Sequence, residues 1–222
     1  MNEIMQGDCL EKMGLMADKS VDLIVTDPPY LMNYKSNRRT VMKKFDHIAN
    51  DVNSNDLISN YLSECERIMK DNTAIYCFCS WHHLDFFKVE FEKHFKLKNI
   101  LVWNKNNHGT GDLKGSYAPK HEFILFGHKG RALNKSKRIP DVIDCQKINS
   151  KDLTHPTEKP QELLKKFVLN NSKEGDLVFD GFAGTGSTGL ACKSLNRKFI
   201  GCELDADFVQ KARTRLNQEG LF

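Results

Sequence analysis

The chain has 222 residues, of which 40% are hydrophobic and 28% are charged, and its formal net charge is +4. This length and apolar content are sufficient for one buried core, so residues 1–222 are expected to form a single α/β domain. No apolar run approaches the roughly 18 to 20 residues of a membrane-spanning helix, which predicts no membrane partner and a cytoplasmic location. The mild net charge does not by itself indicate a nucleic-acid partner.

Seven strands are predicted from short apolar or β-branched runs, at residues 1–6, 21–26, 73–79, 97–103, 121–127, 176–179 and 198–202. Apolar residues at helical spacing predict helices at 9–15, from 54 or 55 to 69, at 83–95, at 161–170 and up to residue 195, with room for one more after 204. The link at 104–120 has no helical pattern, so the strands on either side of it are predicted to be antiparallel neighbours. The seven cysteines show no C-x-x-C spacing, which predicts buried free thiols and no metal site.

The stretch Asp27-Pro28-Pro29-Tyr30 directly follows the predicted strand at 21–26. The prolines end that strand and stiffen the loop, because each fixes its own φ and restricts the residue before it. The Asp27 carboxylate and the Pro28 carbonyl are two acceptors for an exocyclic amino group, and the Tyr30 ring can stack on a base. This arrangement fits a flipped nucleobase, although taken alone the four residues fit an ordinary turn equally well.

A second motif lies at residues 176–203, where a strand is followed by a glycine-rich turn, a helix and a strand that ends at Glu203. The glycines let the backbone approach a ligand, and the acid is placed to accept from ribose hydroxyls. Gly184, Gly186 and Gly189 fit the dinucleotide pattern G-x-G-x-x-G, but a nicotinamide enzyme needs a second half-fold and only 204–222 remain. The turn instead resembles an S-adenosylmethionine loop, with the sequence Asp180-Gly181-Phe182-Ala183-Gly184.

The two motifs in this order resemble those of the amino-methylating DNA methyltransferases of the permuted β class. Two further stretches match that family, Gly7-Asp8-Cys9-Leu10-Glu11 and His155-Pro156-Thr157-Glu158-Lys159-Pro160. The resemblance implies an α/β fold with a seven-stranded, mainly parallel sheet, one antiparallel strand and helices on both faces. It also implies that the strands ending at Thr26 and Phe179 are neighbours, so that both motifs meet at the carboxyl ends of the central strands.

The resemblance further implies a reaction and a role for each matching residue. A target adenine is flipped out of double-stranded DNA, and its N6 amino group receives a methyl group from S-adenosylmethionine. The residues expected to be catalytic are Asp27, Pro28, Pro29 and Tyr30. The residues expected to bind the cofactor are Asp8, Cys9, Thr157, Lys159, Pro160, Asp180, Gly181, Phe182, Ala183, Gly184, Gly186, Glu203 and Leu204. Asp8 fits the N-cap of the following helix equally well.

Two basic segments are expected to contact DNA phosphates, with solvated surface charge as the alternative. The first is the polar stretch 31–55, which we expect to be a mobile loop that closes over the flipped base, and the second is a short target-recognition segment at 130–154. The basic residues concerned are Lys35, Arg38, Arg39, Lys43, Lys44, Lys135, Lys137 and Arg138.

Other functions remain open at this point. Cytosine-N4 methylation uses the same geometry, but that branch usually has serine at the position of Asp27. Methylation of RNA or of protein glutamine resembles an Asn-Pro-Pro motif and lacks this motif order. A catalytically silent DNA-binding relative is the alternative from another class, and the family also allows a homodimer.

Overall fold

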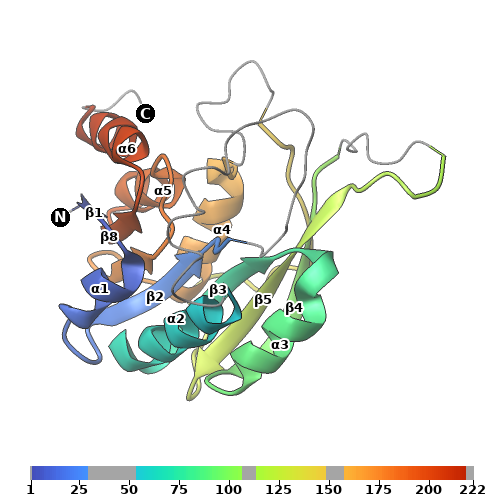
Figure 1. Ribbon diagram of the computed structural model, residues 1–222, viewed down its shortest axis with the longest axis horizontal. Coiled ribbons are helices and arrows are strands. Elements are labelled where there is room, and N and C mark those ends of the chain that lie inside the picture. The colour runs from blue at the N-terminus through green and yellow to red at the C-terminus, as the bar shows by residue number, and fades with distance from the viewer. Residues whose placement is uncertain (1, 30–53, 107–113, 149–157, 219–222) are drawn as a thin grey trace.

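A computed structural model describes residues 2–29, 54–106, 114–148 and 158–218 of the protein. A single β-sheet lies at its centre (Figure 1). Eight strands form one sheet within these ranges, in the order β1-β8-β7-β2-β3-β5-β4-β6. Their bounds are β1 (Asn2–Gln6), β2 (Val21–Thr26), β3 (Met69–Cys79), β4 (Lys96–Asn104), β5 (His121–Lys129), β6 (Val142–Asp144), β7 (Leu177–Asp180) and β8 (Lys198–Glu203). The predicted α/β class is confirmed.

Strand directions also agree with the prediction, because β5 alone among these eight runs antiparallel to its neighbours β3 and β4. The other pairs are parallel, including β2 with β7, so the two strands that carry the motifs are adjacent as expected. The strand count is eight and not seven, since β6 was not predicted. It has three residues, only the middle one is buried, and it is defined by its pairing with residues 102–104 of β4, which leaves no local sequence signal.

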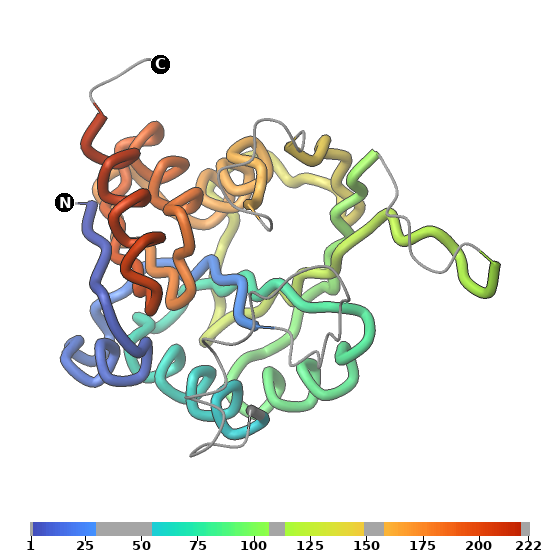
Figure 2. Tube along the Cα trace, turned by 45° about the horizontal axis from the view of Figure 1, so that its top comes forward, coloured from blue at the N-terminus to red at the C-terminus, as the bar shows by residue number. Residues whose placement is uncertain are grey.

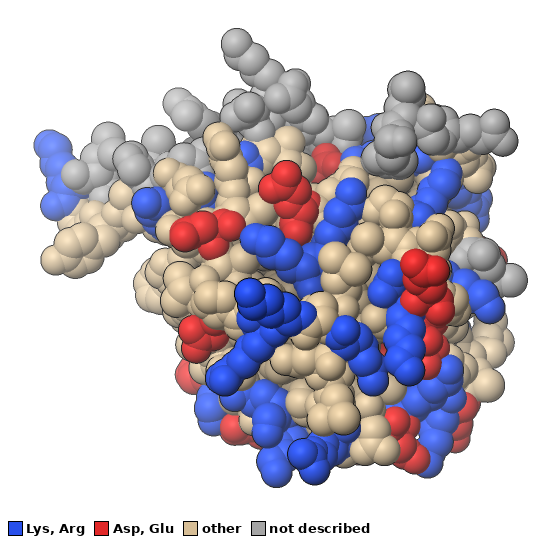
Figure 3. All heavy atoms as spheres, turned by 180° about the vertical axis from the view of Figure 1, so that it is seen from behind, with Lys and Arg blue, Asp and Glu red and all other residues tan. Residues whose placement is uncertain are grey.

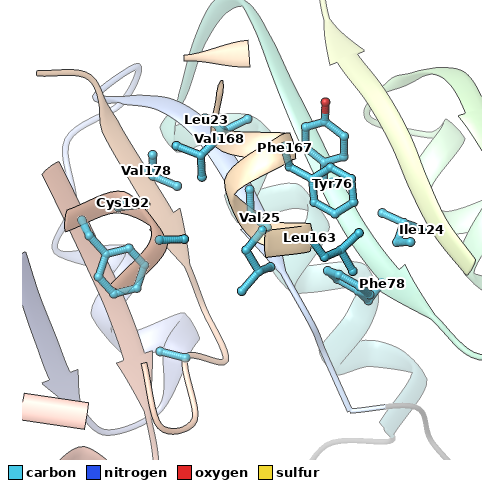
Figure 4. Packing of buried hydrophobic residues seen from close by; sticks show 14 of the residues in the cluster. Leu23, Val25, Tyr76, Phe78, Ile124, Leu163, Phe167, Val168, Val178 and Cys192 are labelled. Carbon is cyan, nitrogen blue, oxygen red and sulfur yellow. The ribbon is translucent and has the colours of Figure 1, made fainter. Parts of the chain in front are cut away.

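Helices cover both faces of the sheet. Helices α1 (Cys9–Gly14), α2 (Ser54–Ile68) and α3 (Leu84–Glu92) contribute to the core on one face, and α4 (Gln161–Asn171), α5 (Ser187–Ser194) and α6 (Ala206–Asn217) to the core on the other. A 3₁₀ turn, η2 (Trp81–His83), precedes α3. On the second face, Phe167 of α4 stacks on Tyr76 of β3 with ring centroids 4.4 Å apart (Figure 4). Fully burying such a side chain contributes roughly 1.5–3 kcal/mol.

Several predicted helix ends differ from the structure, most of them by one residue, and two have a clear structural reason. Met69 was expected in a helix but is the first residue of β3, where it pairs with Val21 of β2. The helix predicted to reach residue 95 ends at Glu92. The Phe95 N–H donates a hydrogen bond to the carbonyl oxygen of Phe91 (2.9 Å), which closes one further turn after the helix. None of the described helices is long and apolar enough to cross a membrane.

The first strand and the last helix are neighbours at one edge of the sheet. The Arg213 guanidinium of α6 donates to the carbonyl oxygen of Ile4 in β1 at 2.8 Å. In Figure 2 the chain can be followed from β1 at one end of the colour range to α6 at the other on the same side of the molecule. Helix α6 therefore packs against β1, and α4 packs against β2 in the same layer.

Candidate active site

A cavity of about 360 Å³ opens at the carboxyl ends of β1, β2, β7 and β8. Ligands of open α/β sheets bind at this edge, and the cavity brings together residues of both sequence motifs. From the expected catalytic and cofactor sets, it is lined by Asp8, Cys9, Asp27, Pro29, Lys159, Asp180, Gly181, Phe182, Ala183, Gly184, Glu203 and Leu204. Twelve of the expected residues, separated by up to 196 positions in sequence, therefore surround one space.

Three described residues of those sets do not line the cavity. Pro28 lies in the Asp27 loop, Pro160 is the N-cap residue of α4, and Gly186 is the N-cap residue of α5 with a left-handed φ of 81°. The Pro160 carbonyl accepts from the N–H groups of Leu163 and Leu164, so this residue begins the helix. Tyr30, Thr157 and the basic residues at 35–44 lie outside the described residues.

Asp180, the last residue of β7, holds the glycine-rich loop. Its Oδ1 accepts from the Phe182 N–H (3.1 Å) and its Oδ2 from the Thr188 hydroxyl at the start of α5 (2.8 Å). Burial raises the pKa of Asp180 to about 7, against the opposing effect of these hydrogen bonds. These two hydrogen bonds tie the loop and the start of α5 to the end of β7, so Asp180 shapes the wall of the cavity.

The fit of an S-adenosylmethionine molecule can be tested on the loop and on Glu203. Gly184 has a left-handed φ of 52°, and a Cβ there would meet no heavy atom within 4 Å, so its open side is available to a ligand. The Glu203 carboxylate lies at the end of β8, where it accepts from the N–H groups of Gly184 (2.9 Å) and Asp205 (2.8 Å). Burial raises the pKa of Glu203, opposed by these hydrogen bonds. Carboxylate oxygens have further lone pairs for ribose hydroxyls, so the residues fit the cofactor.

Asp8 is the N-cap residue of α1, which was one of its two predicted roles. Its carboxylate accepts from the N–H groups of Leu10 (2.8 Å) and Glu11 (3.3 Å), which makes it the N-cap of α1. It also lines the cavity, so the cap does not exclude contact with the cofactor. The neighbouring Cys9 is buried, and burial raises the pKa of its thiol, which keeps it neutral.

Tyr61 of α2 joins the two motifs and was not among the expected site residues. It is fully buried, and its hydroxyl shares a hydrogen bond with Thr26 Oγ1 (2.7 Å) and accepts from the Gly181 N–H (3.2 Å). Its ring meets Phe182 edge-on at 4.8 Å. A Cβ at Gly181 would lie 2.4 Å from this ring, so the position requires glycine. In the sequence, Tyr61 has only the spacing of a helix core residue.

Asp27 contacts Lys159, which lies 132 positions later in the sequence. The Lys159 ammonium lies 2.5 Å from Asp27 Oδ2 and 3.2 Å from Oε2 of Glu122, a residue of β5. Glu122 in turn pairs with Lys105, which follows β4. Lys159 was expected beside the cofactor, whereas Glu122 and Lys105 were not expected in the site at all.

Comparison with known proteins identifies the family. The model of the DNA methylase family matches residues 21–214. The chain belongs to this family. The resemblance inferred from the motifs is confirmed, and the nicotinamide alternative is removed.

Relatives of this DNA methylase match over nearly its whole length. Type II methyltransferase M.HinfI of Haemophilus influenzae is 29% identical over 98% of the chain and 69% of the relative. The DNA adenine methyltransferase YhdJ of Escherichia coli (strain K12) is 28% identical over 96% of the chain and 82% of the relative. The crystal structure of an M1.HpyAVI–SAM complex superposes with a TM-score of 0.73 at 28% identity, covering 98% of this chain and 100% of that one.

One structural neighbour supports only the fold of the DNA methylase. The cytosine-N4-specific PvuII DNA methyltransferase has a TM-score of 0.80 at 16% identity, with 99% of this chain and 88% of the other covered. The fold alone therefore does not distinguish between the two target bases.

The expected DNA-binding residues of the second basic segment lie on the surface. Lys135, Lys137 and Arg138 are exposed in the segment between β5 and β6. Figure 3 shows Lys and Arg side chains spread over the back of the molecule, opposite to the view of Figure 1. The Lys135 N–H donates a hydrogen bond to the carbonyl oxygen of Asn170 (2.6 Å), which connects the segment to α4.

Proposed function

We propose that this DNA methylase transfers the methyl group of S-adenosylmethionine to the N6 amino group of a flipped adenine in double-stranded DNA. One observation carries the proposal: the Asp27 carboxylate and the glycine-rich loop line the same cavity, although they lie more than 150 residues apart in sequence. Catalysis by proximity and orientation requires this arrangement, because the acceptor must be held close to the methyl donor.

The cofactor, when bound, supplies an electrophilic methyl group on a sulfonium. The protein's own residues bind the cofactor and orient the target amino group. Glu203 accepts from ribose hydroxyls, and the loop at 181–184 lets its backbone come close to the ligand. Asp180 and Tyr61 keep that loop in place from behind through their hydrogen bonds.

At the Asp27 loop, we assign the two hydrogens of the target amino group to the Asp27 carboxylate, which lines the cavity, and to the carbonyl of Pro28, the next residue of the loop. These hydrogen bonds would draw the nitrogen lone pair out of conjugation with the ring and direct it toward the methyl group. The N–CH3 bond would form as the S–CH3 bond breaks, with S-adenosylhomocysteine as the leaving group and one amino proton released. Flipping the base costs a few kcal/mol of stacking, and we assign the replacement of that stacking to the Tyr30 ring.

Adenine is favoured over cytosine by two observations. The motif begins with Asp27, where the cytosine-N4 branch usually has serine. The relative YhdJ, which aligns over 96% of the chain, is named a DNA adenine methyltransferase. Cytosine-N4 methylation and a silent DNA-binding relative remain the alternatives that an experiment must exclude.

Incubation with unmethylated genomic DNA and labelled S-adenosylmethionine, followed by nucleoside analysis, tests the proposal. We expect the label in N6-methyladenine, and a matched sample of Asp27→Asn should incorporate it at about a hundredth of the wild-type rate or less. Asp85→Asn, which changes an exposed aspartate in the first turn of α3, should behave as wild type. Label in N4-methylcytosine would refute the base assignment, and absence of label from DNA would refute the reaction.

Narrower expectations belong to the same proposal. We assign phosphate contacts to Lys135, Lys137 and Arg138 and to the basic residues of the stretch 31–55, and target recognition to 130–154. We also expect a cytoplasmic protein that can form a homodimer. Phosphate contacts should make DNA affinity fall steeply with salt. A Lys137→Ala and Arg138→Ala double variant should therefore show a shallower salt dependence than wild type.

A further inference from the structure

Lys159 is a buried ammonium placed between two carboxylates. Its side chain is only 9% exposed, with Asp27 Oδ2 at 2.5 Å and Glu122 Oε2 at 3.2 Å. The Phe78 ring lies beside it, with its centroid 4.9 Å from the ammonium nitrogen. Pro160 follows directly and restricts the backbone of Lys159, so the lysine enters the site from a rigid helix start.

The chain of charges continues away from the cavity. Glu122, whose side chain is 20% exposed, pairs also with Lys105, and the Lys105 ammonium lies 5.0 Å from the centroid of the Trp103 ring. The four charges alternate in sign and sum to zero. Four segments meet here, namely the loop after β2, the entry to α4, the start of β5 and the end of β4.

Stability is a weak explanation for this arrangement. Desolvating two ions can cost as much as their attraction returns, so a buried ion pair is often no better for folding than apolar residues of the same size. The network is instead suited to fixing directions, because Asp27 is held by the Lys159 ammonium, Lys159 is held in turn by Glu122, and Glu122 is held by Lys105. Burial alone would lower the pKa of Lys159, but the Asp27 and Glu122 carboxylates raise it, so the ammonium stays charged.

We propose that Lys159 and Glu122 are positioning residues of the methyl-transfer reaction, which orient the Asp27 carboxylate toward the target amino group. Glu122 acts through Lys159 and touches neither substrate nor cofactor; it does not line the cavity. This inference rests on the proposed function. It differs from the expectation that Lys159 serves the cofactor, since it assigns the lysine to the carboxylate that holds the base.

The test measures the single-turnover methylation rate with saturating genomic DNA, and separately the cofactor Kd by calorimetry. Glu122→Gln keeps the shape of the side chain and removes its charge. We expect its rate to fall at least tenfold while the cofactor Kd stays within twofold of wild type. The matched control is Glu90→Gln on α3, because Glu90 is also a glutamate paired with a lysine, Lys93 at 2.5 Å, but Lys93 does not line the cavity, whereas Lys159 does.

Each other outcome overturns the inference. A Glu122→Gln rate within twofold of wild type removes Glu122 from the reaction. A weakened cofactor Kd with an unchanged rate means that Lys159 serves the cofactor. If Glu122→Gln does not fold, Glu122→Asp keeps the charge but withdraws it from Lys159, and a wild-type rate in that variant refutes the positioning role. Failure of the proposed function is recognised separately, because wild-type protein itself would then label no DNA.

Discussion

Removal of the Tyr61 hydroxyl should weaken both the fold and the cofactor site. Tyr61→Phe takes away the acceptor of the Gly181 N–H (3.2 Å) and the partner of Thr26 Oγ1 (2.7 Å), and it leaves the buried amide of Gly181 without an acceptor. Such a loss costs about 1–3 kcal/mol. For a protein of this size, a change of about 2 kcal/mol corresponds to a decrease of roughly 4–8 °C in Tm.

The loop that loses its anchor lines the cavity that we propose for the cofactor. We therefore expect the cofactor Kd of Tyr61→Phe to rise by about three- to tenfold, because about 1.4 kcal/mol corresponds to a factor of ten in affinity. Urea unfolding gives the free energy of unfolding, and calorimetry with S-adenosylmethionine gives the Kd. Both measurements need only purified protein and no DNA.

Tyr76→Phe is the matched control for this prediction. Tyr76 is equally buried, and its hydroxyl donates to Asn171 Oδ1 (2.5 Å) and accepts from Asn170 Nδ2 (3.1 Å), but it lies away from the cofactor cavity. This variant should lose a similar free energy of unfolding with a cofactor Kd within twofold of wild type. If both variants weaken cofactor binding equally, or if Tyr61→Phe changes neither quantity, the bracing role of Tyr61 is refuted.

Three further predictions concern carboxylates of the cavity. Asp27→Asn should lower the methylation rate by about 100-fold or more while calorimetry finds cofactor affinity within twofold, and near-normal turnover would contradict its role. Glu203→Gln should raise the cofactor Kd by about tenfold, and an unchanged Kd would remove it from the site. Because the pKa of Asp180 is raised to about 7, the folded state holds an extra proton between about pH 4 and 7, so the stability that this group contributes is lost as pH rises through that window. The difference in unfolding free energy between wild type and Asp180→Asn should therefore fall by at most about 4 kcal/mol between about pH 4 and 7. A constant difference over this pH range would show that the pKa is not raised.

Much of the fold could be predicted because its signals are local. Apolar runs located seven of the eight described strands, and the missing helical pattern at 104–120 correctly predicted that β4 and β5 are antiparallel neighbours. The three residues of β6 carry no such signal, because that strand is defined by its partner β4. Met69 was misassigned since an apolar residue at the junction of a helix and a strand fits both patterns.

The candidate site was predictable where residues form a contiguous motif, and unpredictable where they meet only in space. The glycine-rich loop and Asp27 could be located from sequence alone. Glu122 and Lys105 could not, since a glutamate and a lysine near strand ends are commonly solvated surface residues. Lys159 belonged to a motif, but its contact with Asp27 spans 132 positions and depends on how the sheet is ordered.

The contact between β1 and α6 has a consequence for protein engineering. Since Arg213 of α6 already binds the carbonyl of Ile4 in β1, a linker between these elements would join neighbours and need not rearrange the sheet. New ends opened between β6 and α4 would then place the glycine-rich loop ahead of the Asp27 loop in sequence, with the cavity unchanged. The succession of the two motifs along the chain is thus a matter of where the polypeptide is cut, and the chemistry depends only on their meeting at the same edge of the sheet.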